Sequence, residues 1–352
     1  MTETLGRLTY PEITGQPEAL AAALQQCAVQ SDWIDRYLAS SDYDEIIFIG
    51  SGSSYYQSMT MAATARLWLN RPATALPSSE IYLFRRQNAV EGRRYLLVGV
   101  SRSGESTEVL LALESVKDLA GWTRCGITCH EDSSMAQMVP CLVSPLGKER
   151  STVMTKSFSS MTFMMQAAIA KAAALADMEQ ELAATAKASR DNVERADRFA
   201  QRLAGRGPFS RYLFLGMGAY YGLSQEAMLK VKEMAVVWSE SFGTLEFRHG
   251  PKSVVEPGAL VCVLVSESAR SYELKVAEEM KQYGATVVLL TAREGADTAF
   301  ADAVFVTGCP DSTDEARAVL NLPPLQYLGY YTALSKGIDP DSPRNLTQVV
   351  KI

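Results

Sequence analysis

The sequence predicts an α/β fold made of two tandem domains, each a doubly wound parallel sheet flanked by helices. The chain has 352 residues, enough for two domains of ordinary size. A strand, a Gly-x-Gly turn and a helix follow one another in Tyr43–Leu67, and the same order recurs in Arg211–Met234. Strands that alternate with helices indicate parallel sheets covered on both faces, and the repetition indicates a duplicated domain.

Each copy continues with further strands. An apolar run that ends in hydroxyl-bearing residues follows the first helix of each copy, in Tyr95–Glu108 and in Ala259–Glu273. Shorter apolar runs predict further strands at Arg124–Thr128, Thr286–Thr291 and Ala303–Thr307.

Helices are expected between and after the two copies. Residues Thr155–Leu203 are rich in Ala, Met, Gln and Glu and contain neither Gly nor Pro, which favours long helices that brace the domains. A second helical stretch, Ala316–Lys336, is interrupted by Pro323 and Pro324. Prolines keep the last residues extended, and their apolar side chains favour a tail packed against the protein: Leu346, Val349, Val350 and Ile352.

We therefore expect four parts along the chain: an N-terminal helical segment (1–40), a first domain with bracing helices (41–190), a second domain (191–340) and a C-terminal tail that closes over the site (341–352).

Composition and charge exclude several classes of protein. The net charge is −6 without a basic block, which argues against a nucleic-acid partner. There is no long uninterrupted apolar run and no signal-peptide pattern, so we expect no membrane segment. Six cysteines without metal-site spacing favour a reducing compartment, the cytoplasm. With only His130 and His249 available, we expect no metal and no cofactor.

The strongest local motif is a serine-rich loop between an apolar strand and a helix, Ser101-Arg102-Ser103-Gly104-Glu105-Ser106-Thr107. Hydroxyls and backbone N–H groups at a helix N-terminus bind anions, and a phosphate monoester fits such a loop. The alternative is an ordinary solvated N-cap. Four hydroxyl residues among seven exceed what a cap needs, so we favour a phosphate site.

A second turn, Gly50-Ser51-Gly52-Ser53-Ser54, follows the first strand. A dinucleotide-binding fingerprint would need a third glycine, and Tyr55 stands in its place. The Gly216-Met217-Gly218 turn of the second copy is equally incomplete. The hydroxyls beside the first turn suit a sugar phosphate better than a dinucleotide.

A third group of candidates lies in the second copy. Glu226, Lys230 and Glu233 are four and three residues apart and share one face of a helix. A solvated charged face is the ordinary interpretation, but the flanking residues are unusually apolar, and a desolvated carboxylate can act as a base near neutral pH. His249 lies in a loop bounded by Gly250 and Pro251, where a histidine has either a structural or a functional role.

Together these motifs resemble the sugar isomerase (SIS) family, and within it the isomerase half of glucosamine-6-phosphate synthase. The similar segments cover nearly the whole chain and stand in the family's order: SGSS at 51–54, SRSGES at 101–106, TKSF at 155–158, EAMLKVKE at 226–233, EFRHGP at 246–251 and PRNL at 343–346. The segment FRHGPKS also resembles the amino-sugar deaminase/isomerase branch associated with galactosamine phosphate.

The resemblance implies a role for each candidate. The phosphate loop would consist of Ser101, Arg102, Ser103 and Ser106, with Ser53 and Ser54 lining the sugar. Glu233 would move a proton between C1 and C2, supported by Lys230 and Glu226. His249 would assist ring opening and, as in the family, reach the neighbouring subunit's site, which implies a homodimer with shared active sites.

Two departures from the synthases matter. Arg102 replaces their glutamine, and Gln348 stands where they carry the tail lysine that forms a Schiff base; an amide cannot form that imine, although it can contact substrate. Lys351 lies three residues further on. The sequence also lacks an N-terminal cysteine nucleophile and a glutaminase segment, so we expect no ammonia release from glutamine.

The expected activity is deamination of glucosamine 6-phosphate to fructose 6-phosphate and ammonia, without metal or nucleotide. Two alternatives of the same class are cleavage of a fructosamine 6-phosphate and isomerisation of another sugar phosphate. A non-catalytic phosphosugar-binding sensor is the alternative of another class, and Glu233 with His249 favours an enzyme over it.

Overall fold

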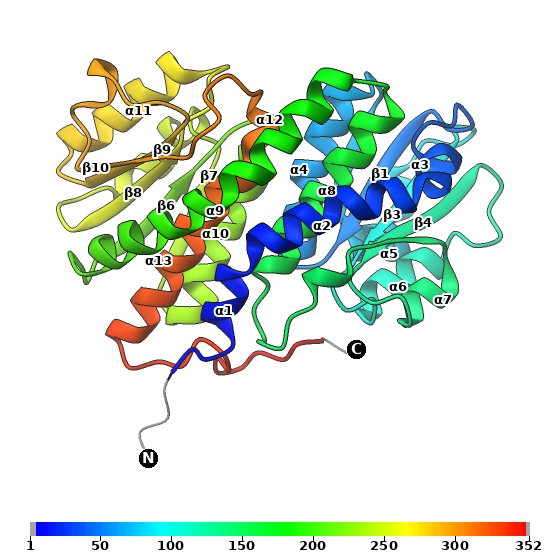
Figure 1. Cartoon of the computed structure of the whole chain (residues 1–352), viewed down its shortest axis with the longest axis horizontal. Helices are drawn as coiled ribbons and strands as arrows, with labels where there is room; N and C mark the ends of the chain where they lie inside the picture. Colours follow the sequence, from blue (N-terminus) through cyan, green and yellow to red (C-terminus); the bar gives the residue numbers. More distant parts are fainter. Residues whose placement is uncertain (1–4, 350–352) are drawn as a thin grey trace. The chain divides into compact units, whose positions relative to one another are not determined.

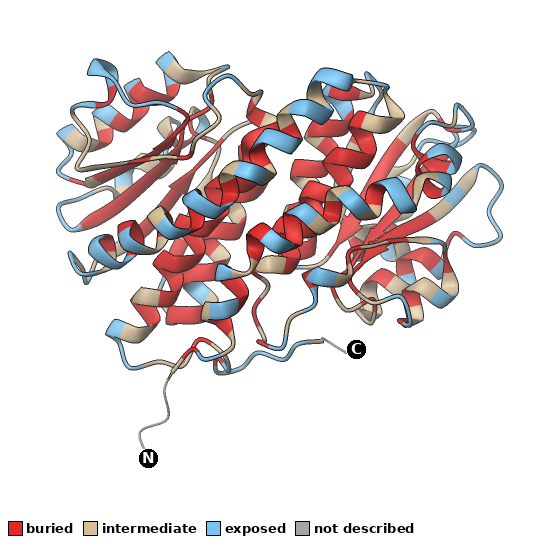
Figure 2. Ribbon diagram, viewed as in Figure 1, coloured by how far each residue is buried: buried red, intermediate tan, exposed pale blue. Residues whose placement is uncertain are grey.

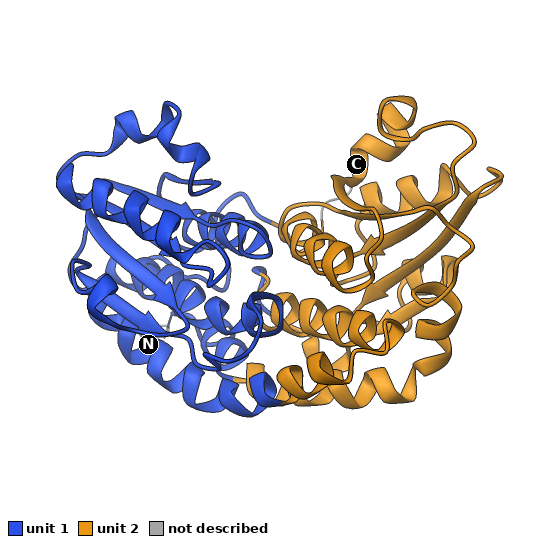
Figure 3. Cartoon of the chain, turned by 90° about the horizontal axis from the view of Figure 1, so that it is seen from above, with its two compact units in different colours: residues 1–14, 151–153, 184–346 blue, residues 15–150, 154–183, 347–352 orange. Residues whose placement is uncertain are grey.

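The computed structural model describes residues 5–349, and the described residues form two compact units (Figures 1 and 3). Unit 1 comprises residues 5–14, 151–153 and 184–346, and unit 2 comprises residues 15–150, 154–183 and 347–349. The long helix α9 (Ala176–Ala204) begins in unit 2 and ends in unit 1.

Unit 2 contains the first strand–helix copy. Its elements in chain order are α2 (Gln16–Val29), α3 (Ser31–Tyr37), β1 (Glu45–Gly50), α4 (Ser53–Trp68), β2 (Ala73–Pro77), α5 (Ser78–Asn88), β3 (Tyr95–Val100), α6 (Thr107–Glu114), β4 (Trp122–Thr128), α7 (Ser134–Met138), β5 (Cys141–Val143), the 3-10 helix η1 (Pro145–Gly147) and α8 (Lys156–Ala172).

Unit 1 contains the second copy. Its elements are α1 (Thr9–Thr14), β6 (Arg211–Leu215), α10 (Tyr220–Ala235), β7 (Ser239–Phe242), the 3-10 helices η2 (Glu246–Arg248) and η3 (Pro251–Val254), β8 (Ala259–Leu264), α11 (Arg270–Gln282), β9 (Thr286–Thr291), η4 (Ala296–Thr298), β10 (Ala303–Val306), α12 (Asp314–Arg317), η5 (Ala318–Asn321) and α13 (Leu322–Ser335).

The two sheets have the same topology. The strand order is β2-β1-β3-β4-β5 in unit 2 and, read in the same direction, β7-β6-β8-β9-β10 in unit 1. Every strand pair is parallel. In both sheets the order reverses beside the first strand of the copy, which is where doubly wound folds bind ligands. The predicted fold of two doubly wound parallel sheets is confirmed, whereas the predicted residue limits of the domains remain a prediction.

The central strands of each sheet are buried on both faces, as Figure 2 shows by their red colour. Alternate residues of β1 and β3 point to opposite sides of the sheet. Ile47 and Leu97 belong to one cluster with Val109 and Leu113 of α6, while α4 and α8 contact the sheet and each other. In unit 1, Val261 and Val263 of β8 pack in one cluster with Val276 of α11. These cores hold the loops at the carboxyl ends of the strands in fixed positions.

Two details refine the expectations. Pro323 and Pro324 interrupt the helical stretch by starting a new helix, α13, because proline is tolerated in the first helical turn. Leu346 is 40% exposed, so the expected packing of the tail is wrong for this residue, and Val350 and Ile352 lie outside the described residues. Among residues 5–349, no helix combines the length and apolar character needed to span a membrane.

Candidate active site

The serine-rich loop of unit 2 lies at the point where the strand order reverses. β3 ends at Val100 and pairs with β1, which ends at Gly50, so the turn after β1 and the loop after β3 lie at the same edge of the sheet. Ser101 and Arg102 are buried, while Ser103 and Ser106 are half-buried. The loop leads directly into α6, whose N-terminus carries the positive end of the helix dipole.

Internal hydrogen bonds hold the loop in shape. Ser101 Oγ lies 3.1 Å from Ser106 Oγ and accepts a hydrogen bond from the N–H of Gly104 at 3.0 Å. Ser103 Oγ accepts from the N–H of Glu105 at 3.1 Å. Gly104 adopts φ +68°, where a side chain would be strained and would collide with Ser133. The tight loop therefore depends on this glycine.

Two backbone donors of the loop are not engaged. Across residues 5–349, the N–H groups of Ser103 and Ser106 donate no hydrogen bond. Both belong to half-buried residues beside the α6 N-terminus. Together with the hydroxyls of the same serines, they can bind the oxygens of a phosphate monoester.

Arg102 points to a carboxylate that the motif analysis did not single out. Its Nη1 lies 3.3 Å from Glu149 Oε2, and the Glu149 side chain is fully buried. Its Nη2 donates to the backbone oxygen of Gln348 at 3.3 Å, while the Gln348 amide donates to Arg150 O at 3.2 Å. Arg102 thus connects the serine loop to Glu149 and to the tail.

Glu149 also orders the start of α8. Its Oε1 accepts from the N–H of Thr155 at 2.8 Å, from the Thr155 hydroxyl at 2.9 Å and from the N–H of Ser157 at 3.0 Å. A carboxylate at a helix N-terminus is favourable for the helix dipole. In the sequence, Glu149 could have been noticed only as an acidic residue shortly before the Thr155–Phe158 motif. The folded loop brings its carboxylate back to the start of α8.

Ser53 and Ser54 begin α4 directly after the Gly50–Gly52 turn and are buried. Ser54 donates its backbone N–H to Ser51 O at 3.2 Å, and its hydroxyl lies 3.9 Å from Met154 Sδ. Gly52 has φ +56° with nothing within 4 Å of a built Cβ, so open space lies beside this turn.

Three of the four charged residues of α10 form one cluster in unit 1. Lys230 Nζ lies 3.3 Å from Glu226 Oε1 and also pairs with Glu233 Oε2. The Lys230 and Glu226 side chains are 1% exposed, and that of Glu233 is 18% exposed. Burial alone would lower the pKa of Lys230, but the two carboxylates outweigh it and raise this pKa above its ordinary value. Lys230 therefore stays charged and fixes Glu233, the most accessible of the three.

His249 is not a member of this cluster. It follows η2 and is exposed, and its backbone N–H donates to Glu246 O at 2.9 Å. Its imidazole has no hydrogen bond or ion pair with any residue that the structure describes. Within the described part of the chain, no three His, Cys, Asp or Glu side chains come together as a metal site.

The chain matches the SIS domain family over residues 39–171 and 210–328, more than half of its length, and it belongs to that family. It is 28% identical over 97% of its length to a glutamine–fructose-6-phosphate aminotransferase (isomerizing) of Pyrobaculum aerophilum. It spans 57% of the length of that relative. It is 29% identical over 88% of its length to a Streptomyces coelicolor protein provisionally named D-galactosamine-6-phosphate deaminase AgaS, of which it spans 83%.

Solved structures extend the similarity. The glucosamine-6-phosphate deaminase of Thermotoga maritima has a TM-score of 0.79 and 30% identity, with 98% of this chain and 99% of that chain covered. The tagatose-6-phosphate ketose/aldose isomerase of Escherichia coli has a TM-score of 0.86 over 97% of both chains. At 23% identity it shows the common fold alone. The predicted membership of the SIS family is confirmed.

Proposed function

We propose that this chain deaminates glucosamine 6-phosphate to fructose 6-phosphate and ammonia. The observation that carries the proposal is the pair of unengaged N–H donors of Ser103 and Ser106, at a helix N-terminus beside the strand-order reversal of unit 2. Such donors suit the dianionic phosphate of a sugar ester. Ser101 and Arg102 would shape the loop, and Ser53 and Ser54 would line the sugar.

Glu233 is proposed as the proton carrier. Lys230 holds its carboxylate in place, and Glu233 is the member of the α10 cluster with the largest exposed fraction. A positioned carboxylate can transfer a proton between two carbons as a general base and acid. Lys230 and Glu226 would support Glu233 without contacting the reacting carbons.

The proposed reaction needs only water as a co-substrate. The sugar ring opens to the aldehyde, Glu233 removes the proton at C2 and a proton is returned at C1, which leaves an imine at C2. Water adds to that imine, and ammonia leaves as the C2 ketone forms. The atoms and electrons of this reaction balance without an oxidant or a metal ion. His249, exposed and without a side-chain partner among the described residues, is proposed to assist ring opening in the site of a second copy.

Two of the relatives are named as amino-sugar-phosphate deaminases, and they support deamination as the proposed reaction. The Thermotoga maritima glucosamine-6-phosphate deaminase is 30% identical and matches over 99% of its own length. The Streptomyces coelicolor relative, with galactosamine 6-phosphate in its name, makes the C4 epimer the second candidate substrate. Gln348 is compatible with both, because hydrolytic deamination needs no covalent lysine adduct.

The test is ammonia release from glucosamine 6-phosphate, with galactosamine 6-phosphate, fructosamine 6-phosphate and plain hexose 6-phosphates run in parallel. We expect release from glucosamine 6-phosphate, its loss in Glu233→Gln, and a raised KM in Ser103→Ala. Glu278→Gln, an exposed carboxylate of α11, is the matched control and should keep full activity.

Ammonia release from galactosamine 6-phosphate alone would contradict the proposed substrate but support the proposed deamination. Thermal stabilisation by glucosamine 6-phosphate without any turnover of the panel would contradict an enzyme and support a phosphosugar sensor. Full activity of Glu233→Gln would contradict its role as the proton carrier.

A further inference from the structure

Unit 1 contains a loop that corresponds to the phosphate loop of unit 2. Residues Val265–Ala269 follow β8, the third strand of the second copy, and lead into α11. The sheet position is the same, because β8 pairs with β6 as β3 pairs with β1. The loop also carries serines, Ser266 and Ser268. By topology alone, the chain should therefore have a second phosphate site.

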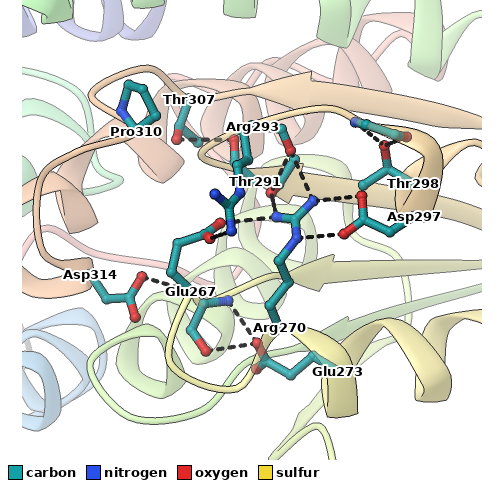
Figure 4. A network of polar contacts seen from close by, with 12 residues as sticks. Glu267, Arg270, Glu273, Thr291, Arg293, Asp297, Thr298, Thr307, Pro310 and Asp314 are labelled. Carbon is teal, nitrogen blue, oxygen red and sulfur yellow. Dashed lines mark hydrogen bonds and ion pairs between the residues drawn. The ribbon is translucent and has the colours of Figure 1, made fainter.

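The donors of this second loop are already engaged, in contrast to those of the first. The N–H groups of Glu267 and Ser268 donate to the two oxygens of Asp314, at 2.9 and 3.1 Å, and the Ser268 hydroxyl donates to Asp314 at 2.8 Å. The N–H and hydroxyl of Ser266 donate to Glu273 Oε2, at 2.7 and 2.8 Å. Figure 4 shows Asp314 and Glu273 beside the loop.

A buried cation completes the surroundings of Asp314. Arg317 is 1% exposed, and its guanidinium pairs with Asp314 and donates to the hydroxyl of Tyr220 at 3.1 Å. Burial alone would raise the pKa of Asp314, but the loop N–H groups, Arg317 and Ser268 outweigh it and hold this pKa below its ordinary value. The carboxylate therefore receives two backbone donors, a guanidinium and two hydroxyls, of Ser268 at 2.8 Å and of Tyr220 at 3.4 Å. This is the kind of donor set expected around a bound phosphate.

We propose that the second serine loop is an anion site closed by the chain's own carboxylate: Asp314 takes the place of a substrate phosphate and limits each chain to one phosphate site. The proposal rests on the proposed function of the first loop as the phosphate site. Asp314 is tethered at the start of α12, so its local concentration exceeds that of any free anion. Displacing it would also leave the buried Arg317 charge without its carboxylate.

The test counts inorganic phosphate bound per chain by equilibrium dialysis with radiolabelled phosphate. We expect one phosphate in the wild-type protein and a weaker affinity for it in the Ser103→Ala/Ser106→Ala variant, which loses two hydroxyls of the first loop but keeps its backbone donors. In Asp314→Gly, the loop donors that Asp314 had occupied should bind a second phosphate together with Arg317. If the space left by the aspartate side chain is too small for phosphate, formate should bind there instead. Asp314→Asn is the control, because its side chain still fills the site and should admit no second anion.

Asp314→Gly removes the partner of a buried charge and should have a lowered Tm. Added phosphate or formate should raise this Tm more than it raises that of the wild-type protein, with chloride at equal ionic strength as the reference. The proposal is overturned if folded Asp314→Gly gains neither anion. If that variant folds under no condition, the wild-type count decides, since two phosphates per chain contradict the proposal and one phosphate per chain supports it.

The ammonia assay separates this proposal from the proposed function. If Asp314→Gly binds a second anion but no amino sugar releases ammonia, the proposal for the second loop is supported and the proposed deaminase activity is contradicted. If the wild-type protein releases ammonia but binds two phosphates per chain, the deaminase activity is supported and the proposal for the second loop is contradicted.

Discussion

Arg102 and Glu149 form a buried ion pair, with Nη1 of the arginine 3.3 Å from Oε2 of the glutamate. The exposed fractions of their side chains are 8% and 0%. The pair joins three segments of unit 2, because Glu149 accepts from the first turn of α8 and Arg102 donates to the tail at Gln348. Arg102 is thus bound to protein groups on two sides.

The first prediction concerns the tail. Arg102→Gln removes the charge that holds the Gln348 carbonyl, and a hydrogen bond to a charged group contributes about 1.5 kcal/mol. We expect trypsin to cleave after the exposed Arg344 about tenfold faster in the variant. Arg86→Gln, an exposed arginine of α5, is the control. Equal cleavage rates in Arg102→Gln and the wild-type protein would show that Arg102 does not hold the tail.

The second prediction concerns the shape of the phosphate loop. In Gly104→Ala the new Cβ would lie 2.1 Å from Ser133 Oγ, in addition to the strain of φ +68°. Gly92→Ala is a matched control, because Gly92 has φ +83° but nothing within 4 Å of the added Cβ. The left-handed backbone should cost each variant about 1–2 kcal/mol. The collision should cost Gly104→Ala roughly 1–3 kcal/mol more in urea unfolding, and equal losses would argue against it.

The third prediction concerns the α10 cluster. Lys230→Met leaves the buried Glu226 and the partly buried Glu233 without their cation, which should lower the free energy of unfolding by roughly 3–5 kcal/mol. Adding Glu226→Gln should restore part of that loss, because one uncompensated buried charge is removed. Lys232→Met, at an exposed position of the same helix, is the control. Strictly additive losses in the double variant would mean that the two side chains are not coupled.

The fourth prediction concerns the dependence of stability on pH. Burial raises the pKa of Glu273 from its ordinary value of 4.5 to about 7, although hydrogen bonds from Ser266 and Thr244 oppose the rise; the charge of Asp314 adds to it. Between these values the folded protein keeps a proton that the unfolded chain releases. Its stability should therefore fall as the pH rises through this window, by up to about 1.4 kcal/mol per pH unit.

Glu273→Gln removes this titration and can keep both contacts: its amide oxygen would accept from Ser266, and its amide nitrogen would donate to Thr244 Oγ1 in place of the hydrogen bond that Thr244 donates to Glu273. The slope of unfolding free energy against pH between about 4.5 and 7 should become flatter in this variant. Glu278→Gln on the same helix should leave the slope unchanged. A slope shared by all three proteins would mean that Glu273 does not titrate in this window.

Much of the fold followed from local patterns. The apolar runs at Arg124–Thr128 and Thr286–Thr291 are strands with nearly the predicted limits, because a strand buried on both faces needs a continuous apolar run. The spacing of Glu226, Lys230 and Glu233 predicted one helical face, and the helix brings them into ion-pair contact. Both features depend on residues close together in the chain.

The tail was less predictable. Its apolar residues suggested burial, yet Leu346 is 40% exposed, because periodicity carries no information on what an extended segment meets. The contact of Gln348 with Arg102 spans 246 residues of sequence, and no local pattern encodes such a separation.

The sequence by itself determined the parallel sheets, their duplication, the serine loop and the charged face of α10, since each arises from a period or motif within one segment. The tertiary structure alone decided which loops keep free donors. Ser103 and Ser266 lie in similar loops, but only the second loop meets the carboxylates of Glu273 and Asp314. Asp314 reaches Glu267 across 47 residues, and only the folding of unit 1 brings the two together.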